Sequence, residues 1–435
     1  MEIKKNNLNT ELDLPLELHI SFKKIYEVFE KYAKSDFKNH PVHESAKNMI
    51  TRLKQVPELI NGFTDLDILE KHKEEIDLLL NPLFPELLLL NEIKAASVPF
   101  SFTSFKLTSR FENILNNAGE DFELKVKNFE EDSMYIMACT FILGFHYNVI
   151  ADIKRPFYFN IPDKNSGTMR YYRAAFNADF TEITRTEKAP KLTESDFKEL
   201  LNNYDNVELW REKFPPKSYI FKGFGIMNLF DVTAEEMISS IKAILLAEEE
   251  NFIDLLQDNL RDFYAIRDLR LGYSILSNIS SQPFNIVIRG VNSIILNKHQ
   301  ELKCESAFFC NTIISKVFDK KETFVISNLE EYGNNTNKNE FYKTLKEQGI
   351  KSIVLIPIQP KSSNDLALLE IASPRAFDLN SVNINKLKDI LPVFKAAVNR
   401  ASEERQNNLE ATIQENYTSI HSSVKWRFYE AVEKF

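Results

Sequence analysis

The spacing of apolar residues predicts a helical first part of the chain. Four apolar side chains follow one another at the i, i+3, i+4, i+7 spacing of a single helix face: Ile25, Val28, Phe29 and Tyr32. Helical spacing returns at residues 46–53, 66–80, 86–96 and 102–115. Prolines interrupt these segments, because a proline disfavours helix in the residue before it. We therefore predict a helical region over residues 1–117.

Beyond residue 117 the pattern indicates a mixture of helices and strands. An apolar segment at residues 132–145 predicts a helix, and Thr193 with Asp196 three residues later has the pattern of a helix capping box. Runs rich in β-branched and aromatic residues predict strands at residues 157–161, 169–183 and 219–229. The sequence PDKNSG between the first two runs predicts a hairpin turn. We predict an α+β domain over residues 118–230, in which no motif is recognised.

The third region, residues 231–402, also contains both helical spacing and β-prone runs. Helical spacing is present at residues 233–250, 252–263, 305–318 and 339–348, and β-prone runs are present at 269–277, 284–295 and 323–328. The stretch over residues 349–400 is the most regular part of the chain. It contains a short apolar run at 353–358, a polar turn, a second apolar run at 366–372 and helical spacing from Asn383 onward.

This third region resembles a GAF domain, a small-molecule sensor module. The resemblance covers roughly residues 235–402 and is carried by three segments, ETFVISNL, KSIVLIPI and ALLEIASP. It implies an antiparallel sheet with helices packed against it. The whole chain is also similar to larger GAF-containing proteins of Bacteroidetes, in which a segment like SIHSSVKWRF follows the domain and the chain continues. Our overall expectation is an α+β fold with a GAF-like domain at residues 231–402.

Several positions depart from the family pattern. Ala367 stands where the family usually has glycine, and Asn328 stands where an acidic residue is common. The NKFDE run of cyclic-nucleotide-binding relatives is missing, and neither Cys304 nor Cys310 is followed by the histidine of bilin-attaching relatives. The known ligands of the family therefore do not transfer, and the sequence leaves the cofactor unknown.

A GAF-like ligand pocket would lie between one face of the sheet and the helices on it. Aromatic residues on the segments expected there are the candidates for ligand binding: Phe308, Phe309, Tyr332 and Tyr342. Apolar pockets and apolar cores use the same residue types, so each of these side chains is also a candidate for plain core packing.

The last part of the chain predicts an exit helix over residues 403–435. An apolar stripe precedes this segment, at the end of the GAF-like region, and consists of Leu387, Leu391, Phe394, Val398 and Ala401. Pro392 lies within this stripe and predicts a kink or a restart of the helix. The stripe continues at Leu409, Ile413, Tyr417, Ile420, Val424, Phe428, Ala431 and Phe435. The intervals between these apolar residues are closer to an eleven-residue repeat than to a heptad, and this spacing predicts a nearly straight helix pair. The second helix of such a coiled coil would come from a partner protein or from a second copy of the chain in a homodimer. A natural chain seldom stops inside such a helix, so we expect a longer protein.

Composition and charge exclude some function classes. The net charge of −9 disfavours broad binding of nucleic acid or of an anionic membrane. No segment approaches 18 uninterrupted apolar residues, so we expect no membrane span. The three cysteines, Cys139, Cys304 and Cys310, are too few for a disulfide framework, and a cytoplasmic location fits them best.

The sequence contains no catalytic signature. It has neither GxGxxG nor GxxxxGK[ST], so the usual backbone cradles for nucleotide phosphates are missing. His299, Cys304 and Cys310 lack the spacing and the fourth ligand of a zinc site, so we expect no metal. We therefore expect a non-enzymatic protein that senses a small molecule and signals through its C-terminal helix.

Two alternatives stay open. The GAF-like fold could be a structural interaction module without a pocket. The protein could instead be an enzyme with its site in the middle domain, near a hairpin that carries Arg170, Arg173 and Arg185.

Overall fold

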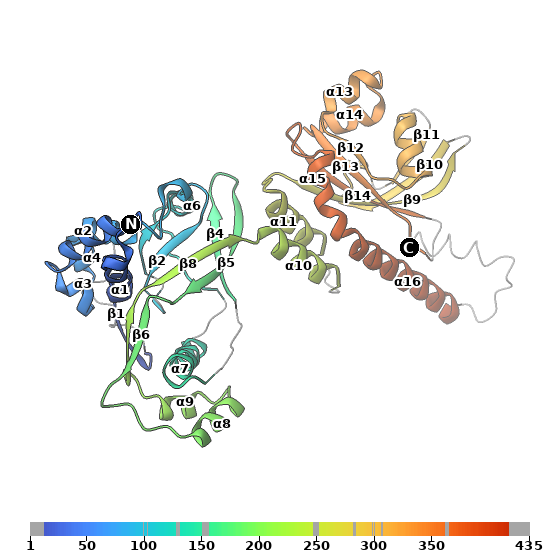
Figure 1. Ribbon diagram of the computed structural model, residues 1–435. Helices are drawn as coiled ribbons and strands as arrows, with labels where there is room; N and C mark the ends of the chain where they lie inside the picture. The colour runs from blue at the N-terminus through green and yellow to red at the C-terminus, as the bar shows by residue number, and fades with distance from the viewer. Residues whose placement is uncertain are drawn as a thin grey trace. The chain divides into compact units, whose positions relative to one another are not determined.

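The computed structural model describes residues 13–98, 100–101, 103–127, 131–149, 156–246, 252–281, 284–297, 299, 301–305, 308–361 and 365–416 (Figure 1). The chain divides into two compact units. One comprises Met1–Asn165 and Met169–Val232, and the other comprises Ser166–Thr168 and Thr233–Phe435. Within the described ranges, no helix combines the length and the apolar character needed to span a membrane.

The first unit contains two sheets and a set of mostly short helices. Its helices are α1 (Lys23–Tyr32), α2 (His43–Leu53), α3 (Pro57–Asn61), α4 (Asp67–Lys71), α5 (Lys73–Leu80), α6 (Ser109–Ala118), α7 (Glu131–Tyr147), α8 (Glu194–Asn202) and α9 (Val207–Lys213), with short 3₁₀ turns η1 (Ser35–Phe37) and η2 (Glu86–Leu88). Its strands are β1 (Leu16–His19), β2 (Lys94–Ser97), β3 (Ser104–Leu107), β4 (Phe157–Asp163), β5 (Thr168–Asn177), β6 (Thr181–Arg185), β7 (Tyr219–Gly223) and β8 (Gly225–Asp231). The sheet orders are β1-β7-β6 and β3-β2-β8-β5-β4.

Two of the helices predicted in the first part are wrong. Residues 86–96 contain only the short turn η2 and then β2, and residues 102–115 contain β3 before α6 begins. Ala95, Ala96 and Ser97 are buried in β2, which pairs with β3 on one side and β8 on the other. Small side chains suit this inner position, and pairing with β8, which is distant in sequence, overrides the helix propensity of alanine.

The single strand predicted at residues 219–229 is two strands, β7 and β8, which belong to different sheets. The chain turns at Gly223, whose φ of 136° is one that other L residues rarely adopt. A Cβ at this position would lie 2.2 Å from the carbonyl oxygen of Phe180. Glycine is therefore required where the chain passes from one sheet to the next.

Both sheets of the first unit combine early and late segments of the chain. β1 pairs in parallel with β7, and β2 pairs antiparallel with β8. The predicted division at residue 117 therefore separates strands that hydrogen-bond to each other. The capping box predicted at Thr193 and Asp196 is present at the start of α8.

The second unit is one six-stranded sheet with helices packed against it. Its strands are β9 (Arg270–Ser281), β10 (Phe284–Val291), β11 (Glu301–Glu305), β12 (Phe324–Ile326), β13 (Ser352–Ile358) and β14 (Leu366–Ser373), in the order β11-β10-β9-β14-β13-β12. Every neighbouring pair is antiparallel. This confirms the predicted α+β class and the expected antiparallel GAF-like sheet.

The helices of the second unit lie on both sides of this sheet (Figure 1). They are α10 (Thr233–Leu246), α11 (Phe252–Tyr264), α12 (Asn311–Ile313), α13 (Leu329–Asn335), α14 (Glu340–Glu347), α15 (Ser381–Ile384) and α16 (Leu391–Asn416), with a π-helical turn η3 (Ile314–Asp319) and a 3₁₀ turn η4 (Asn385–Asp389). The helix predicted over residues 305–318 begins only at Asn311, after β11. The long helix predicted from Asn383 is broken, and α16 restarts it with Pro392 in its first turn, where a missing N–H is tolerated.

The neighbouring inner strands β13 and β14 are buried along their whole length. Ile353 and Leu355 face a core that α12, η3, α13 and α14 cover. Because side chains alternate along a strand, Val354 and Ile356 point to the opposite side. α11 contacts β9, and α16 contacts both β13 and α10. The sheet therefore separates two helical layers.

One carboxyl group is buried within this sheet. Glu370 of β14 is 0% exposed. Its Oε2 accepts the backbone N–H groups of Ile294 at 2.5 Å and Ile295 at 3.0 Å. Its Oε1 accepts the hydroxyl groups of Ser293, at 3.0 Å, and Ser274. The side chain thus fastens the turn after β10 to the centre of the sheet.

Burial raises the pKa of Glu370 above its ordinary value of 4.5, although the four donors oppose this shift in part. The two serine hydroxyls can reverse and accept a hydrogen bond, whereas the two backbone N–H groups can only donate. A proton on Glu370 would therefore sit on Oε1. Because the folded pKa is raised, the folded state holds this proton at pH values where the unfolded chain has lost it. The stability that the folded protein gains from holding this proton is complete below pH 4.5 and declines as the pH rises.

We predict that Glu370→Leu destabilises the protein far more than Glu370→Gln. Leucine leaves the N–H groups of Ile294 and Ile295 buried without an acceptor, at a cost of about 2–5 kcal/mol in the free energy of unfolding. Glutamine keeps one carbonyl oxygen for both N–H groups and cannot ionise. Its stability relative to the wild type should therefore improve as the pH rises above 4.5. Urea denaturation at several pH values measures both effects, and equal losses in the two variants would contradict the assignment.

Candidate functional site

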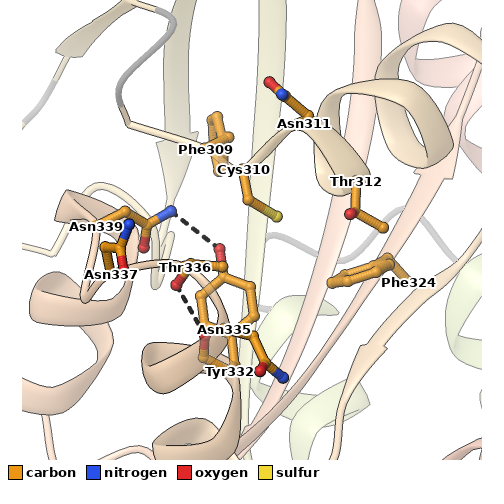
Figure 2. Close-up of a pocket in the computed structure, with 10 residues that line it drawn as sticks. All are labelled: Phe309, Cys310, Asn311, Thr312, Phe324, Tyr332, Asn335, Thr336, Asn337 and Asn339. Carbon is orange, nitrogen blue, oxygen red and sulfur yellow. Dashed lines mark hydrogen bonds between the residues drawn. The ribbon is translucent and has the colours of Figure 1, made fainter.

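A cavity of about 560 Å³ lies on one side of the sheet of the second unit (Figure 2). Its walls come from the segment around α12, from β12, and from α13 with the loop that connects it to α14. This volume is in the range of small-molecule sites, about 300–1,000 Å³. The cavity is the candidate functional site.

The lining is apolar at its base and polar at its rim. Phe309 and Tyr332 are buried, and Phe324, Cys310 and Thr336 are half-buried. Exposed polar side chains form the rim, and these are Asn311, Thr312, Asn335 and Asn337. A ligand would therefore meet aromatic rings below and amide or hydroxyl groups above.

The loop that connects α13 to α14 shapes the rim. Asn328 caps α13 by accepting the backbone N–H of Glu330 at 3.1 Å. After α13 the chain reverses through Asn337 and Lys338, which both have a φ of 50°, and the N–H of Lys338 donates to the carbonyl oxygen of Gly333 at 2.8 Å. This left-handed conformation is one that asparagine tolerates better than most residues. The reversal brings a run of asparagines to the mouth of the cavity.

Asn339 closes the loop through both ends of its carboxamide group. Its Oδ1 accepts the backbone N–H of Tyr342 at 3.0 Å, which caps α14. Its Nδ2 donates to the hydroxyl oxygen of Tyr332 at 3.1 Å, as Figure 2 shows. Because the cap fixes which end of the amide is the acceptor, the NH₂ group is directed toward Tyr332.

The Tyr332 hydroxyl lies at the base of the cavity between two partners. It accepts from Asn339, and the Cys310 side chain lies on its other side. Burial, and then the neighbouring Cys310 side chain, raise the pKa of Tyr332 well above its ordinary value of 10.0. Tyr332 therefore stays neutral at physiological pH, and it offers a ligand a polar group without charge.

A cluster on the outer side of α13 and α14 holds these helices together. The Tyr342 hydroxyl donates to Glu330 Oε2 at 2.9 Å, and Lys346 Nζ lies 2.7 Å from the Tyr342 hydroxyl and 3.0 Å from Glu330 Oε1. The donors Lys346 and Tyr342 lower the pKa of Glu330. A Cβ at Gly333 would lie 2.4 Å from the Tyr342 ring, so only glycine allows this approach.

The four residues singled out from the sequence fall into two groups. Phe309 and Tyr332 line the cavity. Phe308 does not line it; its ring packs against Phe309 and Phe341, with centroid distances of 4.7 and 5.9 Å. Tyr342 is buried in the contact between α13 and α14, outside the lining. Phe308 and Phe309 also precede α12 and do not lie on a helix.

The asparagine rim was missed in the sequence. Four asparagines occur within residues 334–339, in the run NNTNKN, and three of them line the cavity. Such a run is ordinary loop composition, so it gave no functional signal without the geometry. Asn311 stands alone in the sequence and had no signal.

The groups available at the described lining are aromatic rings, carboxamides, hydroxyls and one thiol. Among the described residues, the lining includes no carboxylate, histidine, lysine or arginine. Across the described part of the chain, no group of three or more His, Cys, Asp or Glu side chains could hold a metal ion. The lining is suited to binding through hydrogen bonds and ring contacts.

The three arginines of the predicted basic hairpin lie on two sheets of the first unit. Arg170 and Arg173 lie on β5, whereas Arg185 lies on β6 in the other sheet. Arg185 donates to the carbonyl oxygens of Ala189, at 2.9 Å, and Pro190, at 2.9 Å. Its guanidinium group therefore stabilises a local loop.

No protein-family model and no curated protein matches the sequence. Solved structures with some similarity include fRMsr of Staphylococcus aureus in complex with substrate, at 12% identity over 38% of this chain and 94% of that chain, with a TM-score of 0.25. The GAF domain region of a putative membrane protein from Geobacter sulfurreducens is 18% identical over 38% of this chain and 96% of its own, with a TM-score of 0.24. A bacteriophytochrome from R. palustris is 8% identical over 78% of this chain and 66% of its own, with a TM-score of 0.26. At these TM-scores the assignment of the fold rests on the strand order of the sheet itself.

We predict that Asn339→Ala lowers the free energy of unfolding by about 1–2 kcal/mol, because it removes both the cap of α14 and the bond to Tyr332. Asn339→Ser keeps a capping oxygen and loses only the donor to Tyr332, so it should cost less. Denaturant unfolding of the two variants measures the difference. A serine variant as unstable as the alanine variant would contradict the capping role.

Proposed function

We propose that the second unit is a regulatory sensor domain that binds a small molecule in the cavity between α12 and the loop after α13. The observation that carries this proposal is the cavity itself, with its aromatic base and its rim of neutral polar side chains. In this proposal the protein acts in the cytoplasm and changes the state of a partner helix when the ligand binds.

The cavity favours this function over the two alternatives. An interaction module that had lost its pocket would fill the space with side chains, whereas about 560 Å³ is open here. The enzyme alternative places its site near Arg170, Arg173 and Arg185, and these three arginines lie on strands of two different sheets. Binding without catalysis is therefore the function that this site supports best.

The output would pass through α16. Arg400 of α16 donates to the carbonyl oxygens of Leu245, at 3.2 Å, and Leu246, at 3.1 Å, which lie at the end of α10. The last carbonyls of a helix have no partner within it, so Arg400 supplies one and joins the two helices. The later part of the predicted apolar stripe, from Tyr417 to Phe435, lies outside the described residues.

A strand connects the cavity to this helix. Phe324 lines the cavity and lies on β12, where it pairs with Leu355 of β13. α16 contacts β13 as well as α10. We propose that a ligand with different affinities for two arrangements of β12 and β13 shifts the position of α16, since a ligand can shift an equilibrium only through such a difference. A partner helix or a second copy of the chain would then respond.

We predict that the protein, purified from its own host, retains a small molecule that native mass spectrometry detects. Asn335→Trp should lose this molecule, because the indole would fill the mouth of the cavity. Asn334→Trp is the matched control, since Asn334 is the adjacent, exposed residue of α13 and does not line the cavity. A wild-type protein that retains nothing, or equal retention in both variants, would contradict the proposed binding site.

We further predict that ligand binding changes hydrogen exchange in α16. The low-molecular-weight fraction of a host extract should alter the protection of amide hydrogens in residues 391–416, which lie outside the cavity. Asn335→Trp should show no such change, and Asn334→Trp should respond like the wild type. A change confined to the cavity walls would indicate binding without output through this helix.

A further inference from the structure

We infer that the cavity selects an uncharged ligand that has a flat ring and a carboxamide-like group, a class that excludes carboxylates and phosphates. This inference rests on the proposed function, because it names the chemistry of the ligand that the sensor would bind. It is carried by the charge, the hydrogen-bonding groups and the rings of the lining.

The lining offers no counter-charge to an ionised ligand. None of its described residues is a carboxylate, histidine, lysine or arginine, and burial keeps the Tyr332 hydroxyl neutral. A charged group that leaves water without a partner loses much of its solvation free energy, so an ion is disfavoured here. Lys316 Nζ lies 5.8 Å from the ring centroid of Phe324, but Lys316 is exposed to solvent and does not line the cavity.

The rim offers carboxamide groups that are available to a ligand. In the part of the chain that the structure describes, the side chains of Asn311, Asn335 and Asn337 make no hydrogen bond to protein. Each of these groups has two donor hydrogens and an acceptor oxygen. A ligand carboxamide can satisfy both kinds of group at once through two parallel N–H···O bonds. A carboxylate has acceptors only, so it can use only the donor half of each group.

The base of the cavity offers aromatic surface. Figure 2 shows the rings of Phe309, Phe324 and Tyr332 arranged around the Cys310 side chain. Aromatic rings pack best against another flat ring, in stacked or edge-to-face contacts. Together with the rim, this arrangement fits a ring that carries one neutral polar substituent.

Two pairs of small molecules test the effect of ligand charge on binding while the shape of the ligand stays nearly the same. Nicotinamide and nicotinate have nearly the same outline, as do benzamide and benzoate, and only the amide of each pair is neutral at pH 7. We would titrate all four probes against the full chain by ligand-observed NMR, in the wild type, Asn335→Trp and Asn334→Trp. We expect both amides to bind at millimolar concentrations and each carboxylate to bind at least about tenfold more weakly, a difference of about 1.4 kcal/mol. Asn335→Trp should abolish amide binding, and Asn334→Trp should retain it.

Several results would overturn the inference. Carboxylates that bind as tightly as the amides, and that are lost in Asn335→Trp, would show an anion-accepting cavity and would leave the proposed function intact. If neither amide binds the wild type at millimolar concentrations, the ligand class is wrong, and a molecule retained in native mass spectrometry would still support the sensor. Amide binding that persists in Asn335→Trp would place the probes elsewhere on the chain and would also reject the inference.

Discussion

Burial of β13 and β14 on both faces is the constraint on which the second unit depends. Each residue of these strands is buried, so helices must cover the sheet from two sides. The layer with α13 and α14 holds the candidate cavity, and the opposite layer receives α16. In our account, a change at the cavity can reach α16 only through the strands between them, because interiors packed at this density transmit small displacements.

The described lining of the cavity is polar but carries no charged side chain. Asn339 is central to this property, since its oxygen caps α14 while its NH₂ group holds the Tyr332 hydroxyl. The same carboxamide therefore sets the local fold and orients a group at the base of the site. The sheet solves a different problem at Glu370, where a buried carboxyl is matched by four donors of the protein itself. The first arrangement faces open space, whereas the second is closed.

The sequence predicted features that depend on neighbouring residues and missed those that depend on distant ones. The apolar runs at 353–358 and 366–372 are strands, and Thr193 with Asp196 forms a capping box, because local spacing determines each of these. β2 was mistaken for a helix, because the partners that make Ala95 and Ala96 an inner strand lie in β3 and β8. At the cavity, aromatic character pointed to Phe309 and Tyr332, which line it, and equally to Phe308 and Tyr342, which do not. The asparagine rim has the composition of any exposed loop, and only the reversal after α13 brings it to the cavity.

The central claim is that a small molecule binds against the asparagine rim. The most direct measurement is NMR of the full chain with ¹⁵N-labelled asparagine side chains, before and after addition of the low-molecular-weight fraction of a host extract. Our account predicts shifts in the side-chain amide signals of Asn335, Asn337 and Asn339, while Asn334 changes little. Signals that stay unchanged at these three residues would contradict it.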